Sequence, residues 1–90
     1  MKIILKYTLD VIPDMQAIEM AIDAKFLAVQ MQYSKITLWM VETAGESLRQ
    51  KFYFTVLGTG QKFEQKDCEY LGTVQNGLYV WHIFYNAPVK

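Results

Sequence analysis

The chain has 90 residues, enough for one compact domain over residues 1–90 and too few for two. Hydrophobic residues make up 52% of it, so a buried core is expected without disulfide support. Nine basic and nine acidic side chains cancel, which excludes the global positive field of a protein that binds extended nucleic acid or an anionic membrane. A role in nucleic-acid binding would need a local patch of charge.

Cysteine usage and hydropathy indicate a cytoplasmic protein with no membrane partner. The lone cysteine, Cys68, has no second cysteine with which to form an internal disulfide. No charged segment followed by an apolar run and a cleavage site opens the chain. No apolar stretch approaches the roughly 18 residues of a membrane span.

The first third of the chain alternates with the period of two that is typical of half-buried strands. Residues 3–9 form one predicted strand, and Pro13 ends the pattern because proline lacks an N–H group. Residues 16–22 alternate again and are interpreted as a second strand. A helix over residues 14–28, capped by Asp14, is the competing interpretation, since several of its side chains favour helices.

The rest of the chain continues the alternating pattern. Residues 25–33 and 36–41 predict a hairpin, residues 44–47 a turn, and residues 51–56 a longer strand. The last predicted pair is 70–75 and 78–85. Asn76-Gly77 joins this pair and predicts a type I′ turn, which needs positive φ at both central positions.

Seven short strands with closely spaced turns predict an all-β fold, either a small antiparallel β-sandwich or a partly closed barrel of about six to seven strands. Strands 36–41 and 78–85 are apolar on both faces, and a domain of this size has little second-layer surface to cover them. We therefore expect a homo-oligomer whose interface contains Trp39, Trp81 and His82.

The tripeptide Leu-Gly-Thr occurs twice, and its first copy runs on to give Gly58-Thr59-Gly60. A phosphate-binding glycine loop needs a following helix, and residues 61–68 offer one or two turns at most. The favoured interpretation is that the first glycines let an edge strand bulge and turn, while Gly72 permits close packing. The alternative is a ligand loop of another kind, in which Thr59 and the flanking amides contact a small molecule.

Arg49, Lys51 and Tyr53 share one strand face, opposite Phe52 and Phe54. Such a row suits an anion whose base stacks on the ring, and it equally suits an ordinary solvated face. Both interpretations stay open.

The residue types that often serve in catalysis, such as histidine and cysteine, do not form a catalytic set in this sequence. His82 stands between two apolar residues and is interpreted as a core or interface residue, and Cys68 as an inert thiol. One histidine and one cysteine at no recognisable spacing do not predict a metal site or a nucleophile with its base. We expect no enzyme activity, no metal and no cofactor.

The order of several short segments is similar to that of a family of small uncharacterised proteins encoded by bacteriophages and prophages. These segments are Lys6-Tyr7, Ala24–Gln30, Leu38-Trp39, Val56–Gly60, Tyr70–Gln75 and Val80–Phe84. The chain departs from that family at Ala21-Ile22-Asp23, where Pro-Lys-Gly is expected, and at Gln61, where histidine is expected. A site that depends on that histidine would be lost here.

The resemblance implies a setting and no established activity. By analogy with other small phage proteins, the chain is expected to be a non-enzymatic accessory protein in the cytoplasm of the host bacterium. The leading hypothesis is that it sequesters a small nucleotide immune signal, through the Arg49, Lys51 and Tyr53 face or through the Gly58–Gly60 loop. The alternatives are a direct protein inhibitor of a host defence complex, similar to anti-CRISPR proteins, and a structural or assembly protein of the virion.

Overall fold

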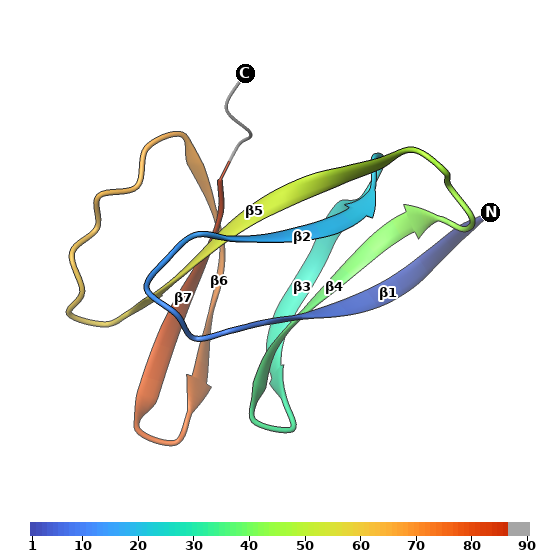
Figure 1. Ribbon diagram of the computed structural model, residues 1–90. Coiled ribbons are helices and arrows are strands. Elements are labelled where there is room, and N and C mark those ends of the chain that lie inside the picture. The colour runs from blue at the N-terminus through green and yellow to red at the C-terminus, as the bar shows by residue number, and fades with distance from the viewer. Residues whose placement is uncertain (87–90) are drawn as a thin grey trace.

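The computed structural model describes residues 1–86, which form seven strands and no helix (Figure 1). The all-β prediction is confirmed, and residues 16–21 are strand rather than helix. Within the described residues there is accordingly no candidate for a membrane-spanning helix. The strands are β1 (Lys2–Leu9), β2 (Gln16–Ala21), β3 (Lys25–Gln32), β4 (Lys35–Thr43), β5 (Arg49–Gly58), β6 (Cys68–Asn76) and β7 (Tyr79–Asn86).

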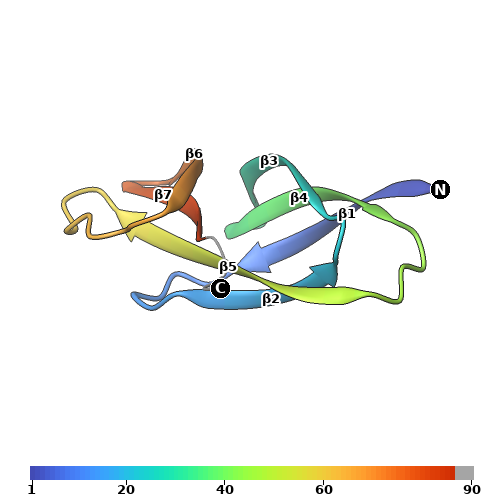
Figure 2. The same ribbon diagram turned by 90° about the horizontal axis from the view of Figure 1, so that it is seen from above.

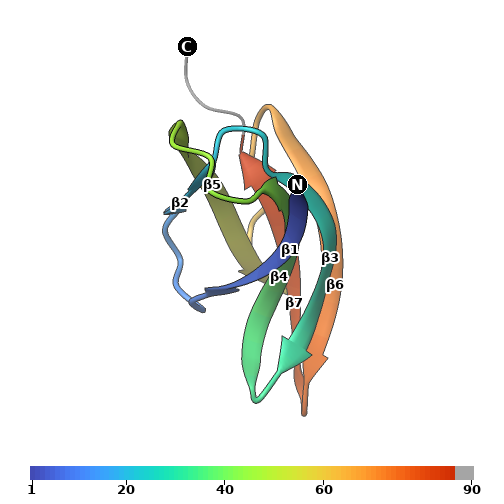
Figure 3. The same ribbon diagram turned by 90° about the vertical axis from the view of Figure 1, so that its right-hand side faces the viewer.

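The strands form two antiparallel sheets that pack as a sandwich. Sheet A has the order β1-β4-β3, and sheet B has the order β2-β5-β7-β6. Seen from above, β1, β4 and β3 lie over β2 and part of the long β5, while β6 and β7 continue beyond them (Figure 2). The edge strands β3 and β6 run side by side (Figure 3). The two sheets do not close into one hydrogen-bonded barrel, so the sandwich form of the prediction is the correct one.

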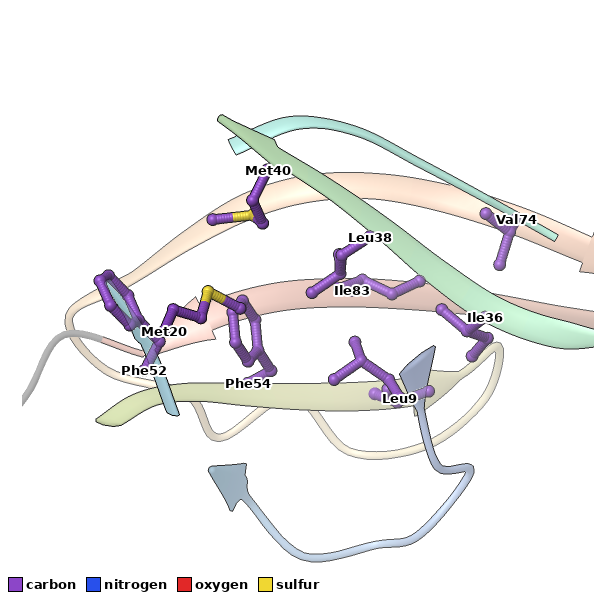
Figure 4. Close-up of a cluster of buried hydrophobic side chains, with 10 residues drawn as sticks. Leu9, Met20, Ile36, Leu38, Met40, Phe52, Phe54, Val74 and Ile83 are labelled. Carbon is purple, nitrogen blue, oxygen red and sulfur yellow. The ribbon is translucent and has the colours of Figure 1, made fainter. Parts of the chain in front are cut away.

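The core lies between the sheets and follows from the alternation of each strand. On β4, Ile36, Leu38 and Met40 point inward and are almost fully buried. They meet Phe54 of β5 and Ile83 of β7, also buried (Figure 4). Burial of each such side chain stabilises the fold by about 1.5 to 3 kcal/mol. The side chains between them, at odd positions of β4, point to the outer face of sheet A.

Two glycines of the repeated Leu-Gly-Thr segment have different structural roles. A Cβ atom on Gly72 would lie 2.7 Å from Cγ1 of Val29, so glycine lets β6 approach β3, as predicted. Gly60 has φ +98° and makes the turn after β5. Gly58 ends β5 at a stretch that pairs with β7 alone, because the pairing with β2 stops at Phe54, so this end of β5 is an edge as expected.

The two hairpins reach their turns differently. In the β3–β4 hairpin, Tyr33 and Ser34 have φ of 51° and 62°, the pattern of a type I′ turn built without glycine. In the β6–β7 hairpin, Asn76 pairs with Tyr79, and Gly77 has φ +62°. The loop is thus Gly77-Leu78 in the manner of a type II′ turn, and the predicted type I′ turn at Asn76-Gly77 is wrong. The observed register places Val74 opposite Trp81 on the inner face, and this packing overrides the local preference of Asn-Gly.

Candidate functional site

Arg49, Lys51 and Tyr53 do share the outer face of sheet B, at the start of β5. Arg49 faces two carboxylates: its Nε is 3.7 Å from Oε1 of Glu19, and one terminal nitrogen is 3.8 Å from Oε1 of Glu42. The other terminal nitrogen donates a hydrogen bond of 3.4 Å to the carbonyl oxygen of Glu19. Lys51 stands directly opposite Glu19 in the β2–β5 register. The positive charge of this row is therefore balanced within the protein.

Glu42 is a buried acid that the sequence analysis missed. Only 1% of its surface is exposed, and it links the two sheets. Its Oε1 accepts a 3.0 Å hydrogen bond from the backbone N–H of Ala21, and its Oε2 accepts one from the hydroxyl of Tyr7. Burial, and then the hydrogen bond to Glu42, raise the pKa of Tyr7 to about 12. Extension of the alternation Ile36, Leu38, Met40 by one step would have placed this glutamate on the core face.

The structure brings Thr59 and His82 together, a contact that the sequence did not predict. The Thr59 hydroxyl lies 2.9 Å from Nε2 of His82, and the Thr73 hydroxyl lies 3.0 Å from Nδ1. Tyr70 extends this row of hydrogen bonds, because its hydroxyl contacts the hydroxyl of Thr73. Both imidazole nitrogens are therefore engaged, and the ring is held in one orientation on the outer face of sheet B.

Aromatic rings lie beside this row of hydrogen-bonded side chains. The centroid of Phe84 is 5.2 Å from that of Phe63 and 5.7 Å from that of Tyr70, and both partners are exposed. The rings of Phe63 and Phe84 border a shallow pocket of about 240 Å³. Its lining residues are Leu57, Gly58, Thr59, Gly60, Gln61, Phe63, His82 and Phe84.

A larger groove, of about 580 Å³, lies on the other side of the Gly58–Gln61 segment. Tyr79 and Trp81 form one wall, with their rings stacked at a centroid separation of 5.9 Å and an angle of 9°. A Cβ atom on Gly58 would stand 3.0 Å from the Trp81 ring, so a side chain at this position would require the indole to shift by a few tenths of an ångström. The remaining lining residues are Val11, Ile12, Pro13, Val56, Thr59, Gln61, Leu78 and Val80.

The Gly58–Gln61 segment thus lines both the shallow pocket and the larger groove. We call this segment, together with Tyr79 and Trp81 on one side and His82 and Phe84 on the other, the Thr59 corner. It is a ligand-sized, largely apolar site with a few placed polar atoms: the Thr59 hydroxyl, the Gln61 amide and the imidazole of His82.

The three expected interface residues lie on separate surfaces. Trp39 is on the outer face of sheet A, Trp81 lines the groove, and His82 is on the outer face of sheet B. Part of the cover that strand β7 needs comes from the chain itself, since Phe63 and Tyr70 pack on Phe84. Self-association stays a prediction.

The remaining reactive groups do not converge in residues 1–86. Cys68 begins β6 opposite Asn86, whereas His82 pairs with Thr73 farther along the same ladder. No group of three or more His, Cys, Asp or Glu side chains in this part of the chain is placed to hold a metal ion. The chemistry available at the Thr59 corner is therefore hydrogen bonding and stacking.

The chain matches the model of a known protein family. The chain belongs to a family described as a domain of unknown function (DUF7352), whose model covers residues 1–90. No curated protein and no solved structure matches the chain. The resemblance to an uncharacterised family is thus confirmed, while the bacteriophage setting stays a proposal.

Proposed function

We propose that this protein acts by binding, without catalysis, and that the Thr59 corner holds a small planar ligand of the nucleotide class. The observation that carries this proposal is the groove of about 580 Å³ beside the stacked Tyr79 and Trp81 rings. Ligand sites typically measure about 300 to 1,000 Å³ and combine apolar walls with a few polar groups. The groove fits both criteria.

Different lining residues would contact different parts of such a ligand. A base would stack on Tyr79, whose side chain is 65% exposed, since every base has a π face that an aromatic ring can cover. The sugar or phosphate would meet the Thr59 hydroxyl and the backbone N–H of Gly60, because the N–H groups of Gly58, Thr59 and Gln61 already donate hydrogen bonds within the protein. Among the described residues 1–86 no lysine or arginine lines the groove, so this site favours a ligand with an exposed base over one with several phosphates.

Arg49 is not part of this site. It stands nine residues before Gly58 on the same strand, which separates the two by about 30 Å at the usual rise per residue. The arginine row and the glycine segment are therefore alternatives, and the engagement of Arg49 by Glu19 and Glu42 favours the glycine segment.

The biological setting that we propose rests on the resemblance to small phage proteins. In that setting the protein is an accessory factor in the host cytoplasm that sequesters a nucleotide immune signal. Sequestration needs only affinity and abundance, which agrees with a site built from stacking and hydrogen-bonding groups.

Isothermal titration calorimetry with cyclic nucleotides and ADP-ribose derivatives tests the proposal. We expect Tyr79→Ala to weaken binding by about five- to a hundredfold, the effect of removing one base–aromatic stack. Tyr33→Ala is the matched control, because Tyr33 is an exposed tyrosine at the tip of the other hairpin. Arg49→Ala should also bind normally. Absence of binding to the wild-type protein at millimolar concentration, or unchanged binding by Tyr79→Ala, would contradict the proposal.

A second candidate function is direct inhibition of a host defence protein through the same groove. The rim favours it, because Leu78 is 98% exposed and Val11 is 52% exposed, and such apolar side chains are common at protein contacts. In that case the nucleotide panel fails, and Leu78→Asp abolishes inhibition of a purified defence complex while the melting temperature stays unchanged.

A further inference from the structure

The outer face of sheet A carries several lysines, although the net charge of the chain is zero. The core residues Ile36, Leu38 and Met40 fix which side chains of β4 point inward, and the strand register then assigns the opposite face of all three strands. Four lysines occupy positions on that opposite face: Lys2 and Lys6 of β1, Lys25 of β3 and Lys35 of β4. The other strand residues there are Ile4, Thr8, Ala28, Gln30, Gln32, Thr37, Trp39, Val41 and Thr43.

None of these strand positions is acidic, so the lysine charge is not balanced within the sheet. Lys2 is the exception, because its Nζ lies 2.7 Å from Oδ2 of Asp23 in the turn before β3. Lys6 donates a 2.8 Å hydrogen bond to the neutral amide oxygen of Gln32 and thus keeps its charge available. Asp10 and Glu46 lie in loops beyond the ends of the strands. Lys6, Lys25 and Lys35 therefore form a positive face of three charges.

A tryptophan stands in the middle of this positive face. In the register Trp39 lies between Lys6 of β1 and Ala28 of β3, and it is half-buried. The short side chain of Ala28 covers little of a neighbouring indole. The bridge from Lys6 to Gln32 crosses β4 over Thr37, which accounts for the burial of that threonine. The surface beside Trp39 thus consists of neutral hydrogen-bonding groups and lysines.

We propose that this face binds a short segment of single-stranded nucleic acid. Its charge complements phosphates, and Trp39 offers a stacking surface for one base, which is the combination that sequence-tolerant single-strand binders use. Gln30 and Gln32 present amides that can hydrogen-bond base edges or sugars. The three lysines then contact phosphates on either side of the stacked base. The site shares no residue with the Thr59 corner and goes beyond the function proposed above.

Fluorescence anisotropy with fluorescein-labelled 12-mers of oligo(dT) and oligo(U) in 50 mM NaCl tests this site. We expect saturable binding that weakens with salt, with a slope of log K against log[NaCl] near about −2 for three phosphate contacts on a single strand. The triple change Lys6→Glu, Lys25→Glu and Lys35→Glu should abolish binding. Lys51→Glu is the matched control, because Lys51 lies on the outer face of sheet B, and it should bind like the wild type.

A second variant tests the role of the indole separately from charge. Trp39→Leu should weaken binding by about five- to a hundredfold while the salt slope stays the same, because one stack is lost and no phosphate contact is. Thermal melts establish that each variant is folded, and Tyr79→Ala, which affects the Thr59 corner, should bind the oligonucleotides normally. Equal binding by the triple variant, or no wild-type binding at millimolar concentration, would overturn the proposal. So would binding to phosphatidylglycerol vesicles in the absence of binding to either 12-mer, since the face would then be a membrane contact.

Discussion

The outer faces of the two sheets differ in whether their basic side chains are paired with acidic ones. On sheet B, Lys51 stands opposite Glu19, and the side chain of Arg49 reaches both Glu19 and the buried Glu42. On sheet A, Lys6, Lys25 and Lys35 have no acidic strand residue beside them. The net charge of zero is thus the sum of one balanced face, one positive face and an excess of acidic residues elsewhere in the chain. Charge on a β protein has to be counted face by face, because the pleat sorts neighbouring residues to opposite sides.

The same comparison corrects the choice of the anion-binding residue. Arg49 offers the planar fork of donors that suits phosphate best, and for that reason the sequence pointed to it. The fold uses this fork beside a buried carboxylate, where a flexible lysine would be a poorer partner. The exposed lysines of sheet A keep their charge for a partner outside the chain.

The largest expected effect comes from breaking the link that neutralises Arg49. Glu42→Ala should lower the free energy of unfolding by about 2 to 4 kcal/mol, because the buried N–H of Ala21 and the hydroxyl of Tyr7 lose their acceptor. Arg49→Ala should cost less than about 1 kcal/mol, since that side chain is 41% exposed. Urea denaturation measures both. Equal costs for the two variants would show that Glu42 serves the surface pair rather than the interior.

The same link predicts a loss of stability at high pH. The pKa of Tyr7 is raised to about 12 in the folded protein, against about 10 in the unfolded chain. The neutral hydroxyl is thus favoured by folding, so its contribution is present below pH 10 and is lost as the pH rises to about 12. Solvent screening of a half-buried side chain limits the loss to about 1 kcal/mol. Melting curves across this range should fall more steeply for the wild type than for Tyr7→Phe.

The backbone of the β3–β4 hairpin of sheet A is strained, whereas that of the β6–β7 hairpin of sheet B is not. Removal of this strain is expected to give a small gain in stability. Ser34 has φ of 62° without being glycine, whereas Gly77 takes φ +62° freely. Ser34→Gly should raise the free energy of unfolding by about 0.5 to 1 kcal/mol. Gly77→Ala should lower it by about 1 kcal/mol. Ser34→Ala is the control, and a gain equal to that of the glycine variant would show that backbone strain is not the cause.

The alternation of apolar residues was enough to predict most of the strands, because side-chain period depends on local sequence alone. It did not decide between strand and helix for residues 16–22, nor the inward faces of strands 36–41 and 78–85, which are apolar on both sides. The exact turn at Gly77 and the role of Glu42 were not predictable in this way. The turn depends on the pairing of Val74 with Trp81, and Glu42 depends on Tyr7 and Arg49, which come from β1 and β5. The contact of Thr59 with His82 likewise joins residues 23 positions apart. Local patterns predict strands, whereas the composition of a site depends on the register between strands.

The smallest expected effect concerns Asp23, the acid that lowers the charge of the sheet A face. Its carboxylate accepts hydrogen bonds from Lys2 and from the hydroxyl and N–H of Thr43, and these hold its pKa well below the usual range. A depressed pKa stabilises the folded state above the ordinary aspartate value of about 3.9, and this contribution is lost as the pH falls below that value. Asp23→Asn should therefore show a smaller decrease in melting temperature between pH 7 and pH 3 than the wild type.

The same variant also sharpens the comparison of the two faces, because it frees Lys2 as a fourth cation on sheet A. At neutral pH, Asp23→Asn should bind the labelled 12-mers more tightly, and the slope of log K against log[NaCl] should change from about −2 to about −3. Glu19→Gln, which frees charge on the outer face of sheet B, is the matched control and should leave both quantities unchanged. A rise in affinity for Glu19→Gln equal to that for Asp23→Asn would mean that the oligonucleotides respond to total charge rather than to the lysine face.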